Sequence, residues 1–368
     1  MPYLFHTRIH TPSIQIPYII HTNFHTASIL HPYLFHAYSI LIPRLFHEFL
    51  SDTSSVTGGS KRGGATLAVT AAEPRVAMAF PVIQNVFHAM PEVFQHDLNC
   101  LGGYNNGWGG HYRAGWYRWF LTPSEKRDQA ELSLNLNKYH KERITNVPMQ
   151  FLLGSNDRMM HLDNINVWWD NDWTAPQKSS LYIQPNAGHS GGDEENFQAM
   201  HIMAQALIKN EIDELPYMEW SYSDDNTLKI CIHRPTAKFY GSLYWGQADN
   251  GRDFRGGGQN DDNFSEIGSC DGSSSDGENV EIVCGDGAYV MTELGNACFG
   301  FEDTHVLANG EYSAMFMTIA FETEYESPDG DNYDYMQSTG PLVRPNTLPF
   351  AGTCVDNQNC DLSSIDRA

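Results

Sequence analysis

Apolar positions follow two different patterns on either side of residue 215. Before it, continuous apolar runs alternate with segments in which apolar residues recur every three or four positions. Continuous runs are typical of parallel strands that are buried on both faces, whereas the second spacing is typical of helices with one buried face. The alternation predicts a doubly wound α/β sheet in the first part of the chain.

The predicted strands of this sheet are short, and each is followed by a helix or a polar loop. They cover residues 54–58 (SSVTG), 75–83 (RVAMAFPVI), 147–155 (VPMQFLLGS) and 179–185 (SSLYIQP). A helix rich in small residues is expected over 60–72, and a second over 193–212 begins with acids, which favour a helix N-terminus. The spacing in the second helix predicts a buried face made of Phe197, Met200, Ala204, Leu207 and Ile208.

From residue 216 onward, alternating or aromatic-rich runs are separated by turns of Gly, Asp and Ser. The runs cover residues 228–235, 241–248, 279–285, 311–325 and 340–350. This pattern predicts an antiparallel β-sandwich. We therefore expect an α/β domain over 48–214, a β-sandwich domain over 215–350 and a polar tail over 351–368.

The first 47 residues repeat with a period of 15. Proline and histidine recur in register, at Pro2, Pro17 and Pro32 and at His6, His21 and His36. Histidine-rich tracts can bind metals, but a tandem repeat joined to the gene model by mistake is the simpler interpretation. The segment also lacks the basic start and continuous apolar core of a signal peptide. We expect an irregular segment and assign it no function.

The charge of the chain narrows the choice of partners. It carries 22 Lys and Arg residues against 45 Asp and Glu residues, which gives a formal charge of -23. So acidic a surface repels phosphate groups, which argues against nucleic acid and anionic membranes as partners. His and Pro interrupt every apolar run before it reaches the ~18 residues of a membrane-spanning helix. We expect a soluble protein without membrane insertion.

Six of the seven cysteines lie after residue 230, and none of their spacings is C-x-x-C. The six are Cys231, Cys270, Cys284, Cys298, Cys354 and Cys360, and Cys100 stands alone in the first part. An even set in a loop-rich region predicts disulfides formed in an oxidising compartment, and reduced core cysteines are the alternative. The sequence leaves the pairing open.

Ser60 stands where a predicted strand gives way to a predicted helix. Two glycines precede it, and two more follow within four residues. A nucleophile elbow requires this setting, because the serine is strained and its neighbours must be small for the helix to pack on the strand. The backbone N–H of Lys61 would then face a developing oxyanion. The alternative is that Ser60 only caps the helix.

Two further residues complete a set in the chain order Ser, Asp, His. Asp157 lies just beyond the strand over 147–155, and His189 lies in the loop after the next strand. The functional crevice of an open α/β sheet lies outside the carboxyl ends of its strands, so we expect Ser60, Asp157 and His189 to meet there. His189 would act as base and acid, and Asp157 would orient its ring. Asp163 is the alternative acid.

Six segments between about residues 50 and 350 form an ordered set of motifs. They are VTGGSKRGG, VPMQFLLGSNDRMM, VWWDN, YIQPNAGHS, GRDFRG and VRPNTLPF. Together they resemble the PhoPQ-activated pathogenicity-related family, which includes autocrine proliferation repressor proteins. The resemblance implies a secreted α/β-hydrolase-like domain followed by a β-sandwich, with Ser60, Asp157 and His189 at the triad positions. It also implies that Arg62, which departs from the usual G-x-S-x-G pattern, is a family trait.

The residues and the resemblance together predict a secreted serine hydrolase. It would cleave a small ester, amide or peptide through an acyl-enzyme, with no cofactor and no metal. An α/β-hydrolase elbow normally follows several strands and a loop that donates a second oxyanion-hole N–H, so we expect an N-terminally incomplete domain. The alternatives are a non-catalytic extracellular signalling or binding protein with a cell-surface partner, and a fragment without function.

Three further features each leave an open question or a structural expectation. Residues 101–120, which are dense in Gly and aromatic residues, are either a lid or an irregular loop. The acids in 251–263 and 327–335 lack the ligand spacing of an EF-hand, which favours solvated turns over Ca²⁺ loops. Arg252, Asp253 and Arg255 are expected to form ion pairs at the interface of the two domains.

Overall fold

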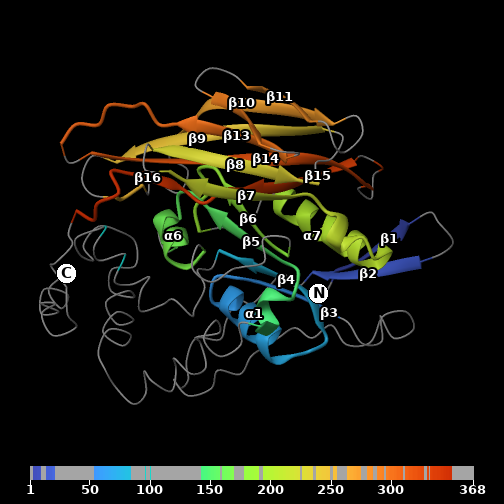
Figure 1. Ribbon diagram of the computed structural model, residues 1–368. Helices are drawn as coiled ribbons and strands as arrows, with labels where there is room; N and C mark the ends of the chain where they lie inside the picture. Colours follow the sequence, from blue (N-terminus) through green and yellow to red (C-terminus); the bar gives the residue numbers. More distant parts are fainter. Residues whose placement is uncertain are drawn as a thin grey trace, which may run out of the picture.

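The computed structural model of the chain describes two short segments near its start and most of the chain from residue 54 to 349. The described residues are 3–9, 14–20, 54–83, 96, 100, 142–157, 160–169, 178–189, 194–223, 226–234, 238–248, 252–254, 263–274, 280–284, 288–293, 296–309, 311–326, 330 and 332–349. They form a mixed α/β fold, in which a parallel sheet with its helices lies beside antiparallel sheets (Figure 1).

The parallel sheet contains the four strands that the sequence predicts. They are β3 (Ser54–Gly59), β4 (Val76–Val82), β5 (Met149–Gly154) and β6 (Ser179–Gln184), side by side in this order. Every neighbouring pair is parallel. All residues of β5 and β6 are buried, as expected for continuous apolar runs, whereas β3 at one edge is partly exposed.

Helices follow the strands of this sheet. Helix α1 (Lys61–Ala72) joins β3 to β4, and helix α7 (Glu194–Lys209) follows β6. The short helices are η2 (Leu162–Asn164) and α6 (Ile165–Trp168) after β5, and η3 (Ile212–Glu214) after α7. Figure 1 shows α1 on the side of the parallel sheet away from the antiparallel sheets, with α7 close to β15 on the other side.

The face that α7 buries differs from the predicted face. Its fully buried residues are Ala199, Ile202, Met203 and Ala206. Of the predicted residues, Met200, Ala204 and Leu207 are partly buried, Ile208 is 47% exposed, and the Phe197 side chain lies outside the described part. The predicted helix is confirmed, but the buried residues lie about one position earlier in the sequence than the predicted ones. The reason is that α7 packs between β4 and the antiparallel strands, where the small side chains of Ala199 and Ala206 allow a close approach.

Two antiparallel sheets make up the second part. The larger has the order β11-β10-β9-β14-β15, with β16 also paired to β14, and the smaller has the order β12-β13-β8-β7. The larger sheet consists of β9 (Lys238–Ala248), β10 (Phe264–Ser274), β11 (Val280–Cys284), β14 (Tyr312–Glu326), β15 (Asn332–Ser338) and β16 (Leu342–Arg344). The smaller consists of β7 (Tyr217–Tyr222), β8 (Thr227–His233), β12 (Ala288–Glu293) and β13 (Asn296–Glu302). The predicted runs correspond to β8, β9, β11, β14 and β16.

Both hydrophobic cores contain side chains from the parallel sheet and from the antiparallel sheets. In the first core, Phe151 of β5 and Trp168 of α6 pack with Phe316 of β14. In the second core, Phe80 of β4 packs in the same cluster as Phe239 of β9, and this cluster also joins the two antiparallel sheets. The two parts are therefore held together by shared apolar burial.

The outer edge of β6 is closed by side chains of β14 and β15. The N–H of Ile183 donates to Ser338 Oγ at 2.9 Å, and the Thr318 hydroxyl donates to the Ile183 carbonyl oxygen at 3.4 Å. Further along, the hydroxyls of Ser180 and Tyr335 lie 3.1 Å apart. Burial raises the pKa of Tyr335 to about 12, so its hydroxyl keeps its proton. We call Ser180, Ile183, Thr318, Tyr335 and Ser338 the polar seam.

The expected disulfides are found in part. Cys231 on β8 and Cys298 on β13 form a disulfide between two neighbouring strands. Cys270 is also disulfide-bonded, and in the β10–β11 ladder it stands opposite Cys284. The last two cysteines of the chain lie outside the described residues. Cys100 is a buried thiol.

The N-terminal repeat contains two described strands where the sequence predicts an irregular segment. Strands β1 (Tyr3–Ile9) and β2 (Ile14–Ile20) pair antiparallel, consistent with their content of aromatic and β-branched residues. The rest of the repeat, residues 101–120 and the tail over 351–368 lie outside the described residues. Among the helices that are described, none combines the length and hydropathy that a membrane crossing requires.

The polar seam predicts a specific loss of stability. Replacing Ser338 with Ala removes the acceptor of the buried Ile183 N–H, which we expect to lower the free energy of unfolding by about 1–3 kcal/mol. Urea denaturation measures this difference. The matched control is Ser269→Ala, at an exposed position of β10, which should change the same quantity by less than about 0.5 kcal/mol. Equal unfolding midpoints for the two variants would contradict the seam.

Candidate active site

The three residues singled out from the sequence lie at the carboxyl ends of three parallel strands. Ser60 directly follows β3 and precedes α1. Asp157 follows β5, and His189 follows β6. Because the strands are parallel, these three ends lie at one edge of the sheet, where open α/β sheets place their functional crevice.

Hydrogen bonds join the three side chains into one chain. Ser60 Oγ lies 2.9 Å from His189 Nε2. His189 Nδ1 lies 3.0 Å and 2.9 Å from the two carboxylate oxygens of Asp157. With its proton on Nδ1, the ring donates to the carboxylate, and Nε2 is left to accept the proton of the Ser60 hydroxyl.

The acid of this hydrogen-bonded series is the most buried of the three side chains. The Asp157 side chain is 1% exposed, whereas that of His189 is 21% exposed. The carboxylate also accepts a hydrogen bond from the Met160 backbone N–H at 3.0 Å, which fixes its orientation. Ser60, the last of the three hydrogen-bonded residues, is half-buried. A solute can therefore reach the serine and the histidine, while the acid is screened from water.

The turn that carries Ser60 is strained and tightly packed. Its backbone has φ 54° and ψ -122°, a region that side-chain-bearing residues rarely occupy. Its N–H donates to the Val82 carbonyl oxygen at 2.8 Å, which ties the turn to the end of β4. A Cβ on Gly58 would come within 2.7 Å of Arg62, so only glycine allows the first turn of α1 to fold back on β3. Gly58 thus has the steric role expected of an elbow glycine, whereas a Cβ on Gly59 would meet nothing closer than 4.0 Å.

A second close approach places the loop that carries His189. A Cβ on Gly154, the last residue of β5, would collide with the carbonyl oxygen of Ala187. The same oxygen accepts a hydrogen bond from the Asn156 N–H at 3.0 Å. The loop after β6 therefore lies directly over the end of β5, next to Asp157. Glycine at position 154 is what allows the acid and the base to come together.

Unusual backbone angles gather at this edge of the sheet. Ser60, Ile83 and Asn186 have φ values of 54°, 47° and 58°, and they follow β3, β4 and β6. The other positive-φ residues with side chains, among those described, lie in turns elsewhere. Positive φ is a genuine outlier for a β-branched residue such as Ile83. Strain of this kind tends to cluster at functional sites.

The alternative acid, Asp163, lies in a different arrangement. It is fully buried in η2, and Arg252 holds both of its carboxylate oxygens at 2.8 Å. His96 Nε2 lies 2.9 Å and Cys100 Sγ 3.3 Å from its Oδ2. Burial alone would raise the pKa of Asp163, but the hydrogen bond with His96 and the charge of Arg252 hold it well below its ordinary value. The histidine of the candidate triad is thus served by Asp157, and Asp163 forms the ion pair expected of Arg252.

His96, Cys100 and Asp163 also bring together ligand types that bind metals, within 4.8 Å of one another. The carboxylate, however, already accepts a hydrogen bond from Arg252 Nη2 and lies in an ion-pair contact with its Nε, and Asn166 adds another hydrogen bond to Oδ1 at 3.1 Å. A dication at this point would face the positive charge of Arg252 at close range. We therefore assign this cluster to structure.

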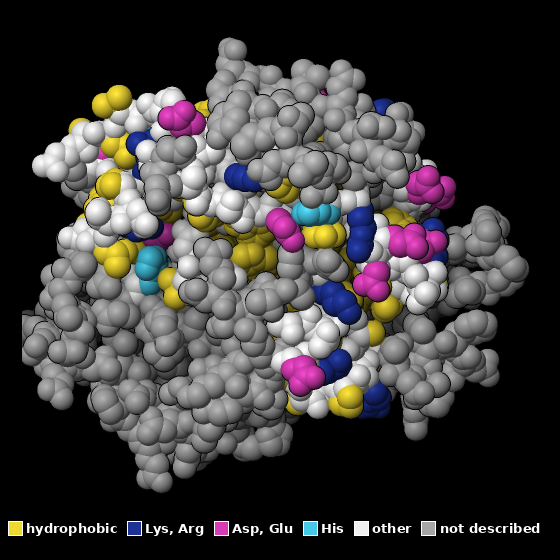
Figure 2. Space-filling view, in the orientation of Figure 1, with side chains coloured by type: hydrophobic (Ala, Val, Ile, Leu, Met, Phe, Trp, Pro, Cys, Tyr) yellow, Lys and Arg dark blue, Asp and Glu magenta, His cyan; other side chains and the backbone are white. Residues whose placement is uncertain are grey.

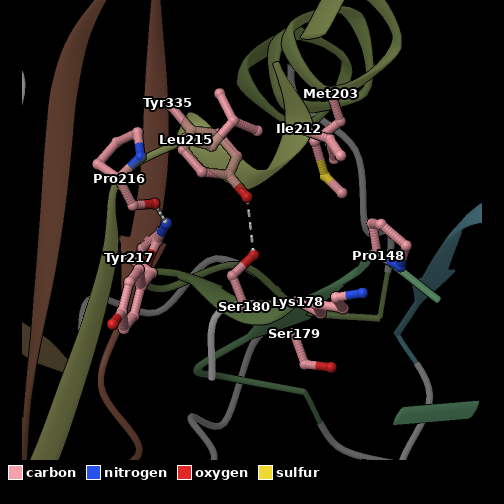
Figure 3. A pocket seen from close by; sticks show the side chains of 11 residues that line it. Pro148, Lys178, Ser179, Ser180, Met203, Ile212, Leu215, Pro216, Tyr217 and Tyr335 are labelled. Atoms are coloured by element: carbon pink, nitrogen blue, oxygen red, sulfur yellow. Dashed lines mark hydrogen bonds between the residues drawn. The ribbon is translucent and has the colours of Figure 1, made fainter. Parts of the chain in front are cut away.

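A small pocket lies at the other end of the parallel sheet. Pro148 and Lys178, which precede β5 and β6, line it with Ser180, Met203 and Tyr335 (Figure 3). Its cavity volume of about 20 Å³ holds about one water molecule. It is too small for an organic substrate, and it lies away from the carboxyl ends of the strands. The pocket is therefore distinct from the candidate active site.

Sequence reasoning missed two residues that shape the site. Gly154 and Asn186 both occur in the motifs named above, within FLLGSND and IQPNAGHS. The sequence alone assigns them no role of their own beside Asp157 and His189. A signal was present for Asn186, because Asn tolerates positive φ better than most residues with side chains. No local signal marked Gly154, since its role depends on a loop that folds over it.

Comparison with known proteins places the chain among related sequences. A family model described as PhoPQ-activated pathogenicity-related protein matches residues 46–255, a range that contains all three candidate triad residues. The chain is 24% identical over 330 residues to Autocrine proliferation repressor protein A of Dictyostelium discoideum. This alignment covers 86% of the chain and 61% of the relative, so the chain spans less than two thirds of the relative's length.

The buried ion pair predicts a large effect of removing one partner. Replacing Asp163 with Asn leaves the Arg252 charge buried at 4% exposure, which we expect to lower the free energy of unfolding by about 3–5 kcal/mol. The contribution is fully present at pH 7, because the depressed pKa keeps the carboxylate ionised. It declines as pH falls below the ordinary Asp value of about 3.9.

Denaturant unfolding at pH 7 measures this loss. The matched control is Glu322→Gln, which breaks an exposed pair with Lys238 at 3.9 Å and should change stability by less than about 1 kcal/mol. The double variant Asp163→Asn, Arg252→Met should lose less than the sum of its single changes. A loss in Asp163→Asn as small as in the control would contradict the assignment.

Proposed function

The chain belongs to the PhoPQ-activated pathogenicity-related protein family, and from that premise we propose that it is a secreted serine hydrolase that cleaves an ester or amide through an acyl-enzyme. One observation carries the proposal: hydrogen bonds run from Ser60 Oγ through the His189 ring to the carboxylate of Asp157. A serine on a strained strand-to-helix turn, joined in this way to a histidine and a buried acid, suits nucleophilic catalysis.

The proposed first step is acylation of the serine. His189 Nε2 takes the hydroxyl proton as Ser60 Oγ attacks the carbonyl carbon of the substrate, which gives a tetrahedral intermediate with a negative oxygen. When this intermediate collapses, the carbonyl re-forms and the leaving group departs with the proton from Nε2. Water then attacks the acyl-enzyme with the same histidine as base, which releases the acid and restores Ser60.

Two groups would stabilise the charges that develop in these steps. Asp157 keeps the Nδ1 proton in place and stabilises the imidazolium that forms on His189. The backbone N–H of Lys61, at the first position of α1, would donate to the negative oxygen. All of these roles use groups of the chain itself, and the proposal involves no metal and no cofactor.

The arrangement of the strands supports an α/β-hydrolase assignment for the first part. The elbow, acid and base loops follow strands of one parallel sheet in the chain order Ser, Asp, His, which is the order of that superfamily. We accordingly propose residues 48–214 as the catalytic domain and 215–350 as a β-sandwich domain. The described disulfide between Cys231 and Cys298 supports an oxidising compartment and hence secretion.

A second candidate function is favoured by one comparison. The similarity to Autocrine proliferation repressor protein A raises the alternative that the chain is an extracellular signal that needs no turnover. Such a signal would act through a surface that binds a cell-surface partner. On the face in Figure 2, acidic and basic side chains of the described residues are interspersed, so a partner there would meet both signs of charge.

Removing the nucleophile tests the hydrolase directly. We expect Ser60→Ala to abolish covalent labelling by a fluorophosphonate probe, because the probe reacts only with an activated serine. Asp157→Asn should slow labelling on the order of 10⁴-fold, because the histidine loses its orienting carboxylate. Labelling is followed by intact-protein mass spectrometry.

The matched control is Ser55→Ala, which removes an exposed hydroxyl from the same strand. It should be labelled at the wild-type rate. Labelling that persists in Ser60→Ala would assign the reactive group to another residue. A wild-type protein that is folded but never labelled would overturn the hydrolase.

The same variant separates the hydrolase from the signalling alternative. Wild-type protein and Ser60→Ala are added to cultured cells of the source organism. If an effect on proliferation depends on turnover by the hydrolase, we expect wild type to slow proliferation and Ser60→Ala to have no effect. Cell counts over several doublings measure the effect. If Ser60→Ala slows proliferation as strongly as wild type, the signalling alternative is the correct one.

A further inference from the structure

Two stretches of the connection between β9 and β10 reach the loops that carry the triad. The first stretch, residues 252–254, is anchored by the ion pair of Arg252 with Asp163, which lies in the segment that follows Asp157. The second stretch is the start of β10 at Phe264. Asn263 Nδ2 donates to the carbonyl oxygen of Phe254 at 3.0 Å, which ties the two stretches together.

One side chain connects the second stretch to the histidine loop. Asn186 Nδ2 donates to the carbonyl oxygen of Phe264 at 2.8 Å, and the Phe264 N–H donates to Asn186 Oδ1 at 2.9 Å. The N–H of Asn186 itself donates to Ser155 Oγ at 2.7 Å. The same loop reaches His189 three residues later. The base loop is thus held from β10 on one side and from the end of β5 on the other.

The pairing requires asparagine at this position. Its side-chain amide supplies one donor and one acceptor to the backbone C=O and N–H of the same residue, Phe264. An aspartate has no donor for the Phe264 carbonyl oxygen. Its φ of 58° is unfavourable for most side chains but accessible to Asn. The two partners are 78 residues apart in the chain, so the contact is not part of a local turn.

We propose that Asn186 is a positioning residue, which fixes the base loop to β10 and keeps His189 Nε2 within reach of Ser60 Oγ. The proposal rests on the hydrolase function, since it concerns the geometry of the same triad. Displacing a reacting group by about 1 Å lowers the rate of an enzyme by as much as about 10²-fold. The second part of the chain would therefore act on catalysis through Asn186, without contacting the substrate.

The test replaces Asn186 with Gly. Glycine keeps the positive φ and the N–H bond to Ser155, so this change removes only the two bonds to Phe264. We expect fluorophosphonate labelling of Ser60 to slow by about 10-fold to 10²-fold. We also expect the downfield proton NMR signal of His189 Nδ1–H to broaden, because a loosened ring exchanges that proton with water faster.

Asn226→Gly is the matched control. Asn226 has φ 66° and lies in the turn between β7 and β8, so the same substitution at a similar backbone angle is made outside the triad loops. It should leave both the labelling rate and the His189 signal unchanged. Asn186→Asp, which keeps the acceptor and loses the donor, should give an intermediate rate and remains informative if the glycine variant fails to fold. All measurements are made well below the melting temperature of each variant.

The two readouts distinguish this proposal from the hydrolase itself. If wild type is never labelled but the His189 signal broadens in Asn186→Gly, the hydrolase fails and the positioning role stands. If labelling of wild type succeeds and Asn186→Gly matches Asn226→Gly in rate and signal, the positioning role is overturned. A change in melting temperature without a change in either readout also overturns it, because it would show a purely structural contact.

Discussion

Closure of the outer edge of β6 is the constraint on which the site depends. An edge strand normally leaves its free backbone groups to water, but every residue of β6 is buried. Its N–H and C=O groups therefore need partners from the protein. At Ile183 the polar seam supplies both partners, with hydroxyls of Ser338 on β15 and Thr318 on β14, while apolar residues of both parts fill the cores on either side. The loop with the histidine thus starts from a strand that the second part of the chain holds in place.

The candidate site itself is built from conformations that would be unfavourable in isolation. Positive φ angles at Ser60, Ile83 and Asn186 each carry a strain of about 1–3 kcal/mol. Neighbouring contacts maintain them, such as the hydrogen bond from Ser60 N–H to Val82 and the paired bonds between Asn186 and Phe264. The short distances within the triad therefore reflect the surrounding strands and loops as much as the three side chains.

The sequence was informative where a pattern is local. The four parallel strands, α1 and α7 follow from apolar runs, small residues and helical spacing. The positions of Ser60, Asp157 and His189, each after a predicted strand, are enough to place them at one edge of the sheet. Strands such as β10 and β15 were missed because they are rich in polar residues and are stabilised by the ladders on β9 and β14. The buried face of α7 and the partners of Asn186 and Asp163 depend on residues far away in the chain, which no local pattern reveals.

The polar seam also has a consequence for the order in which the surroundings of the candidate site form during translation. A ribosome completes Ser60, Asp157 and His189 long before it reaches Thr318 and Ser338. Until those late residues emerge, the hydrogen bonds that Ile183 of β6 makes with Ser338 and Thr318 cannot form. A growing polypeptide thus contains all three candidate triad residues before these bonds can form. The edge of β6 can close only after β15 has been translated, when of the described strands β16 alone is still to come.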